Sequence, residues 1–171
     1  MGLLIGEDME IFTVAFFGHR YVDDMNRVER GLQEFIRDLL GRKEYVEFLV
    51  GRNGEFDQLV SSSVRIAKRE IRDDNSSLTL VLPYPTAEYL SNQESFEAYY
   101  DAIELCEESN KTHFKGAIQK RNQCMIDRAD LIVVYVNHSS GGAYQAMQYA
   151  EKKGKRILNL AEVVDGVVLV M

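Results

Sequence analysis

The sequence predicts an α/β protein with a Rossmann-like, mainly parallel, doubly wound sheet that carries helices on both faces. Short apolar runs rich in β-branched and aromatic residues alternate with segments whose apolar residues recur at helical spacing, which is typical of βαβ units. The runs are apolar almost throughout, as expected of strands covered on both faces. With 171 residues, 46% of them hydrophobic, we expect a single domain spanning residues 1–171 whose core needs no metal or disulfide.

The apolar runs give the expected strands in order. They fall at residues 11–17, 45–50, 78–82, 131–136, 156–160 and 163–170. Pro83 and Pro85 follow the third run and predict a turn there, because proline fixes its own backbone angle and has no N–H to offer a sheet.

The helices between the strands are predicted from stripes of apolar residues. The first stripe runs from Val28 to Leu39, and Gly41 is expected to end that helix. A second helix begins near Asp57, and a late helix runs from about Ala143 to Gly154. The long connection before the fourth strand is expected to hold two helices, an acidic one near 94–108 and another near 112–128.

The charge and the cysteine content bear on compartment and partners. Twenty Lys and Arg residues against 27 Asp and Glu residues give a net charge of −7, which argues against nucleic acid as a partner because duplex-binding proteins usually have a basic surface. No apolar run has transmembrane length, and the first residues lack the basic segment of a signal peptide. Two cysteines form no disulfide framework. These features predict a cytoplasmic protein with no membrane partner.

Three predicted strand ends carry glycines next to polar residues. In an open parallel sheet ligands bind beyond the carboxyl ends of the strands, and glycine lets the backbone approach a ligand closely. Each end alone also has a structural explanation as a turn, a helix cap or a surface charge. Together they predict a phosphate- or nucleotide-sized ligand, although none forms a Walker or GxGxxG motif. The residues are Gly18, His19 and Arg20; Gly51, Arg52, Asn53, Gly54 and Asp57; and Ser139, Ser140, Gly141 and Gly142.

Arg121 is the most informative charged residue within a predicted helix. It shares the inward face of that helix with Ile118 and Met125, and a buried arginine needs a partner. That partner is either a carboxylate, with Asp57 or Asp130 as candidates, or a ligand phosphate held by the guanidinium. Asn122 offers a further polar group beside it.

No metal site and no cofactor are predicted. His113 lies between Cys106 and Cys124, but this spacing fits no known zinc pattern, and Cys124 is interpreted as a small packing residue. His19 and His138 each follow a strand and would approach one another if the two strands are neighbours. We interpret them as facing ligand or solvent.

Residues 120–160 resemble the SLOG superfamily, which contains the DNA-processing protein A and the Lonely Guy phosphoribohydrolases. The matching features are Arg121, Met125, the apolar strand after Asp130, and Gly141-Gly142 with the helix that follows. The segments VAFFGHR (14–20) and LVGRNGEFDQLV (49–60) resemble a small single-domain bacterial branch of unassigned function. The resemblance spans residues 12–160 and implies a Rossmann-like fold, a nucleotide-derived ligand and often a homodimer.

The chain departs from the Lonely Guy pattern PGGxGTxxE at the residues that carry the chemistry. Gln148 stands at the position of the catalytic glutamate, and a glutamine cannot act as a carboxylate base. Tyr144 stands at the third glycine, where it would either narrow the loop or supply a ring for base stacking. The resemblance therefore implies a module that binds or senses a nucleotide or an ADP-ribose-like ligand.

Two alternatives remain open. One is a hydrolase or transferase that cleaves the N-glycosidic bond of a nucleotide, with Asp57 or Glu55 as the catalytic acid in place of Gln148. The other is a DNA-associated protein, by analogy with the DNA-processing branch.

Overall fold

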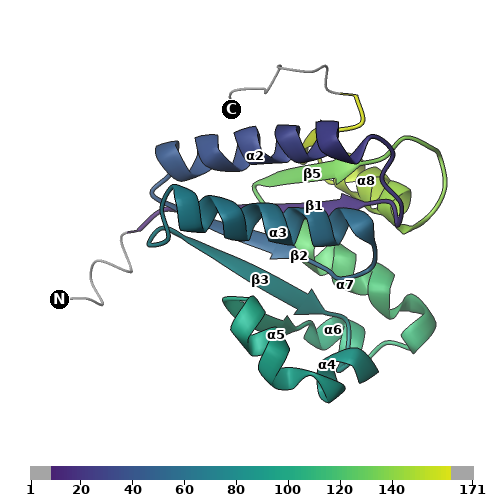
Figure 1. Ribbon diagram of the computed structural model, residues 1–171. Helices are drawn as coiled ribbons and strands as arrows, with labels where there is room; N and C mark the ends of the chain where they lie inside the picture. The colour runs from purple at the N-terminus through teal and green to yellow at the C-terminus, as the bar shows by residue number, and fades with distance from the viewer. Residues whose placement is uncertain (1–8, 163–171) are drawn as a thin grey trace.

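The computed structural model describes residues 9–162, which form a six-stranded, all-parallel sheet in the order β4-β3-β2-β1-β5-β6 (Figure 1). The strands are β1 (Ile11–Gly18), β2 (Tyr45–Val50), β3 (Ser76–Leu82), β4 (Ala102–Leu105), β5 (Leu131–Tyr135) and β6 (Arg156–Asn159). The helices are α2 (Met25–Arg42), α3 (Glu55–Glu70), α4 (Ala87–Ser91), α5 (Gln93–Tyr99), α6 (Glu107–Asn110), α7 (Phe114–Arg128) and α8 (Gly142–Lys152). The predicted doubly wound α/β fold is confirmed.

Helices cover both faces of the sheet, as Figure 1 shows for α2 and α3 on one side and α7 and α8 on the other. On the first face Val14, Phe16 and Phe48 pack against the apolar stripes of α2 and α3. On the second face Ala15 and Ile132 pack against α7 and α8. Alternate residues of one strand therefore serve two cores, which explains why the strand sequences are apolar without interruption.

The strand order reverses between β1 and β5. From β1 the chain adds β2, β3 and β4 toward one edge, and it then returns to place β5 on the other side of β1. The two central strands are paired in parallel up to Gly18 and Tyr135. The loops that leave their carboxyl ends lie where the strand order reverses, and such a switch point is where open α/β sheets form ligand crevices.

The long connection between β3 and β5 differs from the prediction. The acidic helix expected near 94–108 is wrong, since this stretch contains part of α5, the strand β4 and the start of α6. β4 has only four residues, all partly exposed, so its apolar signal is weak. Asp101 aligns it, because its Oδ2 accepts hydrogen bonds from the Leu78 backbone N–H (2.7 Å) and from Lys68 Nζ (2.9 Å).

Two other expectations concern the end of α2 and a last strand near the C-terminus. Gly41 does not end α2, which continues to Arg42 and closes with a hydrogen bond from Lys43 N to the carbonyl of Leu39 (2.9 Å). The strand expected at 163–170 lies outside the described residues. Within residues 9–162, no helix combines the length and the apolar character needed to cross a membrane.

Candidate functional site

A cleft of about 820 Å³ opens at the carboxyl edge of the sheet, above the β1–β5 switch point. The loops after β1, β2 and β5 form its rim, and α7 closes one side. Most of the predicted site residues line it together: Gly18, His19, Arg20, Gly51, Arg52, Asn53, Gly54, Asp57, Arg121, Asn122, Gly141 and Gly142. The three strand ends that the sequence singled out therefore converge on one cavity.

The loops after β1 and β2 lie in direct contact, and two glycines make that contact possible. A Cβ at Gly18 would lie 2.2 Å from the Phe56 ring, and a Cβ at Gly54 would lie 2.5 Å from the Cα of Arg20. Glu55 N donates to the carbonyl of Arg20 (2.8 Å), and Val22 N donates to Glu55 Oε2 (2.8 Å). This side of the cleft is thus held in shape before any ligand arrives.

Arg121 lies beneath the cleft with only 2% of its surface exposed. Its Nη1 donates to the carbonyl of Val81 (2.7 Å) and its Nε donates to Asn122 Oδ1 (2.9 Å). A Cβ at Gly51 would lie 3.1 Å from its Nη2, so glycine lets the guanidinium pass close to the β2 loop. Burial lowers the pKa of Arg121, and the nearby Asp57 opposes that shift.

The two carboxylates proposed as partners of Arg121 behave differently. Asp130 is excluded, because its Oδ2 accepts a hydrogen bond from Thr13 N (2.8 Å) at the start of the sheet. Asp57 lies close enough to attract the guanidinium, yet its Oδ2 accepts from Asn53 N (2.8 Å) and no ion pair within 4 Å joins it to Arg121 in the described part of the chain. Burial raises the pKa of Asp57, while Asn53 and Arg121 lower it.

Two histidines stack where β1 and β5 end. The rings of His19 and His138 lie 3.6 Å apart and nearly parallel, at 7°. Asn137 N donates to His19 Nε2 (3.1 Å), so a neutral His19 carries its proton on Nδ1. Burial, and then the charge of His138, lower the pKa of His19. The approach of the two histidines that the strand order would allow is confirmed.

The third rim is the N-terminus of α8. Gly141 has a φ of 92°, a value that favours glycine, and no side chain caps the helix. The first N–H groups of any helix lack partners within the helix, and here Gly142 and Ala143 place them at the cleft. Oriented amides of this kind bind anions.

Three predicted site residues do not line the cleft. Ser140 Oγ lies 3.2 Å from His138 Nδ1 on the exposed loop, and Ser139 is exposed beside it. The Tyr144 hydroxyl accepts a hydrogen bond from Gln148 Nε2 (3.1 Å) along α8. Tyr144 therefore neither narrows the loop at the cleft nor presents a ring inside it.

Arg20 and Arg52 both line the cleft but differ in their contacts. The Arg52 guanidinium already has partners, because Nε donates to Glu88 Oε1 (3.0 Å) and Nη1 donates to the Tyr100 hydroxyl (3.0 Å). Arg20 is exposed, and among residues 9–162 no side-chain partner holds its guanidinium. Of these two arginines, Arg20 is the one that is free to meet a ligand.

Tyr21 and Ile118, which were not among the predicted site residues, also line the cleft, as does His138, which was interpreted as facing ligand or solvent. Tyr21 is 72% exposed, and its position directly after the glycine-bearing strand end 18–20 is the one sequence signal that would have identified it. A second cavity of about 900 Å³ lies between α7 and α8 and shares Ile118, Asn122 and Gly142 with the cleft. The two cavities therefore adjoin.

The residues considered for N-glycosidic cleavage are mostly not placed to act on a ligand in the cleft. Gln148 lines the cavity between α7 and α8 and not the cleft. Glu55 accepts the Val22 N–H, which commits one carboxylate oxygen to the loop. Asp57 is the one acid among the described lining residues of the cleft.

Comparison with known proteins identifies similar structures but no similar sequence. Neither a family model nor a curated protein matches the sequence. DNA processing protein A from Streptococcus pneumoniae aligns with a TM-score of 0.61 at 12% identity, over 86% of this chain and 49% of that protein. DNA processing protein A from Helicobacter pylori aligns with a TM-score of 0.60 at 16% identity, over 85% of this chain and 63% of that protein.

The chain shares its fold with DNA processing protein A. This likeness is one of fold, and it confirms the Rossmann-like fold that the resemblance implied. The chain spans about half to just under two thirds of the length of these two structures.

The comparison also corrects one expectation. The Helicobacter pylori structure is described by its single-stranded DNA binding mode, so the argument against nucleic acid as a partner was wrong. That argument used the net charge of the whole chain, whereas Arg20, Arg121 and the first N–H groups of α8 gather hydrogen-bond donors and positive charge at the cleft.

Proposed function

We propose that this chain binds the phosphate group of a nucleotide or nucleotide derivative in the cleft at the carboxyl edge of the sheet. The observation that carries the proposal is the convergence of Arg121 and three glycine-bearing loops on one cavity. The α8 N–H groups and the exposed Arg20 supply donors, and Arg121 supplies a fixed positive charge beneath them. A role in binding or sensing suits this arrangement better than N-glycosidic cleavage, because Gln148 and Glu55 are turned to other partners.

The test is a thermal-shift and calorimetry series with phosphate, pyrophosphate, AMP, ADP and ADP-ribose. A ligand at 100 times its dissociation constant stabilises the folded state by about 2.7 kcal/mol, which gives a clear rise in Tm. Arg121→Lys keeps the charge but loses the planar fork, so we expect affinity to fall about tenfold or more. Lys120→Gln removes a charge from the neighbouring exposed residue and should leave affinity unchanged.

Because Arg121 is buried, a loss of affinity in Arg121→Lys can also come from a folding defect. A second variant, at an exposed residue, separates the two causes. Arg20→Gln alters an exposed side chain and should weaken binding several-fold with an unchanged circular dichroism spectrum. If no phosphate-bearing compound stabilises the parent protein at millimolar concentration, the proposal fails.

A second candidate function is association with single-stranded DNA, and the structural likeness to DNA processing protein A favours it. A strand would present its phosphates to Arg20 and the α8 amides, with Tyr21 exposed at the mouth for base stacking. Fluorescence anisotropy with labelled oligo(dT) at increasing salt tests it, since phosphate contacts make affinity fall steeply with salt. We expect Arg20→Gln to weaken the binding of the DNA strand, and Tyr21→Ala, as a separate variant, to weaken it more. If both variants bind oligo(dT) as tightly as the parent protein, this cleft is not the DNA site.

The homodimer and the cytoplasmic location stay predictions. Sedimentation equilibrium of the purified chain measures the first, and fractionation of cells that produce it measures the second.

A further inference from the structure

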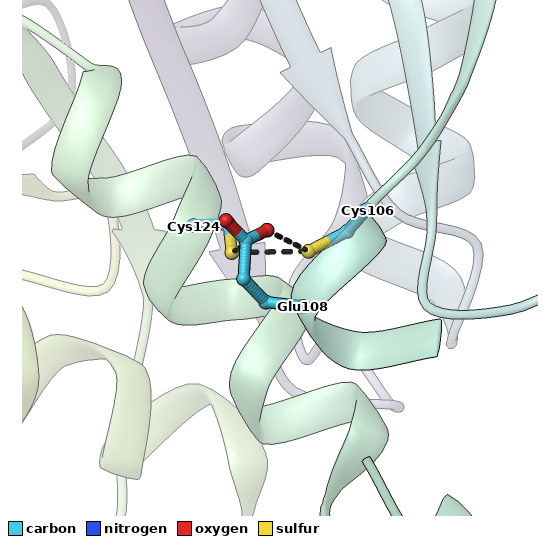
Figure 2. A group of neighbouring side chains, drawn as sticks. All are labelled: Cys106, Glu108 and Cys124. Carbon is cyan, nitrogen blue, oxygen red and sulfur yellow. Dashed lines mark hydrogen bonds between the residues drawn. The ribbon is translucent and has the colours of Figure 1, made fainter. Parts of the chain in front are cut away.

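Two cysteines and a glutamate meet on the side of α7 near the β4–α6 junction (Figure 2). Cys106 follows β4, Glu108 lies in the first turn of α6, and Cys124 lies on α7. The sulfurs are 3.0 Å apart, and Glu108 Oε2 lies 3.5 Å from each of them. The fold brings together cysteines that are 18 residues apart, which their spacing did not predict.

The separations of the three atoms resemble those around a tetrahedral metal ion. Zn–S bonds of about 2.3 Å and Zn–O bonds of about 2.1 Å place a sulfur and an oxygen about 3.6 Å apart and two sulfurs about 3.8 Å apart. Both S–O distances of 3.5 Å already agree with this geometry. The sulfurs need to separate by roughly 0.8 Å, and Cys124 is only partly buried, so its side chain has room to turn.

The chemistry of the donors also favours a cation over a disulfide. A disulfide would need the sulfurs to approach to about 2.05 Å, would need an oxidant and would give Glu108 no role. Three potential anions around one point repel one another, and a divalent cation relieves that repulsion.

We propose that Cys106, Glu108 and Cys124 bind a divalent thiophilic cation of the zinc class, with a fourth position left to water. Two thiol protons pass to solvent as the two metal–sulfur bonds form, and the carboxylate oxygen supplies the third bond. Thiolates select zinc over magnesium or calcium, and the carboxylate favours a dication over copper(I).

The bound cation would cross-link the start of α6 to α7. The α7 helix also carries Arg121 and Asn122. The site is nevertheless separate from the cleft, since none of its three ligands lines that cavity. Its presence or absence does not decide whether the cleft binds phosphate.

The test uses the full chain, reduced and freed of metal, with zinc chloride and cobalt chloride as probes. We expect one equivalent of zinc by competition with a chromogenic chelator, a rise in Tm on zinc addition, and an intense tetrahedral cobalt spectrum with thiolate charge transfer. Cys124→Ser, at a partly exposed position, should weaken zinc binding at least 100-fold. Glu108→Gln should weaken it about tenfold or more, and Glu107→Gln, one residue away, should leave it unchanged.

Several outcomes would overturn the proposal. One is a reduced parent that binds zinc no better than the Cys124→Ser variant. Another is a chain that forms a Cys106–Cys124 disulfide in air yet has no zinc affinity when reduced. Equal affinity in Glu108→Gln and Glu107→Gln would reject the three-ligand site.

Discussion

The two sides of the cleft are built differently. The braced rim, residues 18–22 and 51–57, is tied by Glu55 N to the carbonyl of Arg20, by Val22 N to Glu55 and by Asn53 N to Asp57. The open rim, residues 137–143, is mostly exposed and ends in the uncapped start of α8. Apart from Arg20, the braced rim thus uses its polar groups to hold its own shape, whereas the open rim leaves the first N–H groups of α8 available as donors. We therefore expect the braced rim to fix where a ligand sits, and the Arg20 guanidinium together with the N–H groups of the open rim to contact its charge.

Replacing one glycine on each rim tests this comparison with the largest effect. Gly54→Ala places a Cβ 2.5 Å from the Arg20 backbone, which cannot move aside as a side chain would. We expect a loss of about 2–3 kcal/mol in the free energy of unfolding, measured by urea denaturation. Gly142→Ala meets no atom within 4 Å and should stay within about 0.5 kcal/mol of the parent. Equal losses at both positions would show that the rims do not differ.

Gly51→Ala tests the link between the braced rim and Arg121. The new Cβ would lie 3.1–3.3 Å from the guanidinium, so Arg121 must move by a few tenths of an ångström. We expect a stability loss of about 1 kcal/mol and a phosphate affinity that falls as it does in Arg121→Lys. Unchanged affinity by calorimetry would show that the position of Arg121 does not matter to the ligand.

The two rims meet where His19 stacks on His138, and His19 makes the stability of the folded chain depend on pH. His19 has a lowered pKa in the folded state, so below about pH 6.5 the unfolded chain takes up a proton that the folded chain resists. The contribution of His19 to stability is complete above that pH and is lost as the pH falls toward its folded pKa. His19→Asn should flatten the fall in Tm between pH 7 and pH 5. A slope identical to that of the parent would assign the effect to other groups.

The smallest effect is expected on the open rim itself. Ser140→Ala removes an exposed hydroxyl 3.2 Å from His138 Nδ1. Exposed contacts of this kind contribute little, so stability should change by less than about 0.5 kcal/mol and phosphate affinity should stay the same. A several-fold change in affinity would make Ser140 a ligand contact and bring it back into the site.

The strands and the loops of the cleft could largely be predicted from the sequence, because they depend on local patterns of residues. The strands read as uninterrupted apolar runs, and glycines at Gly18, Gly51 and Gly54 mark the places where the backbone must pass close to a neighbour. Since the carboxyl ends of parallel strands lie at the same edge of a sheet, the parallel sheet expected from the sequence already places those loops on one edge.

The features that were missed depend on long-range contacts or weak signals. β4 is a four-residue edge strand without a buried residue, and it is aligned by Asp101, a polar residue that no periodicity reveals. Arg52 was assigned to the ligand, but Glu88 of α4 and Tyr100, the residue directly after α5, hold its guanidinium. The meeting of Cys106 with Cys124 likewise required the packing of α6 on α7.

The placement of α7 has a thermodynamic consequence. Arg121 and Cys124 are three residues apart on this helix, so one turn carries a residue of the cleft and a ligand of the proposed cation site. If metal alters the affinity for phosphate, phosphate must alter the affinity for metal by the same factor. Measuring both affinities in one thermodynamic cycle would reveal whether the helix transmits information between them or only supports each separately.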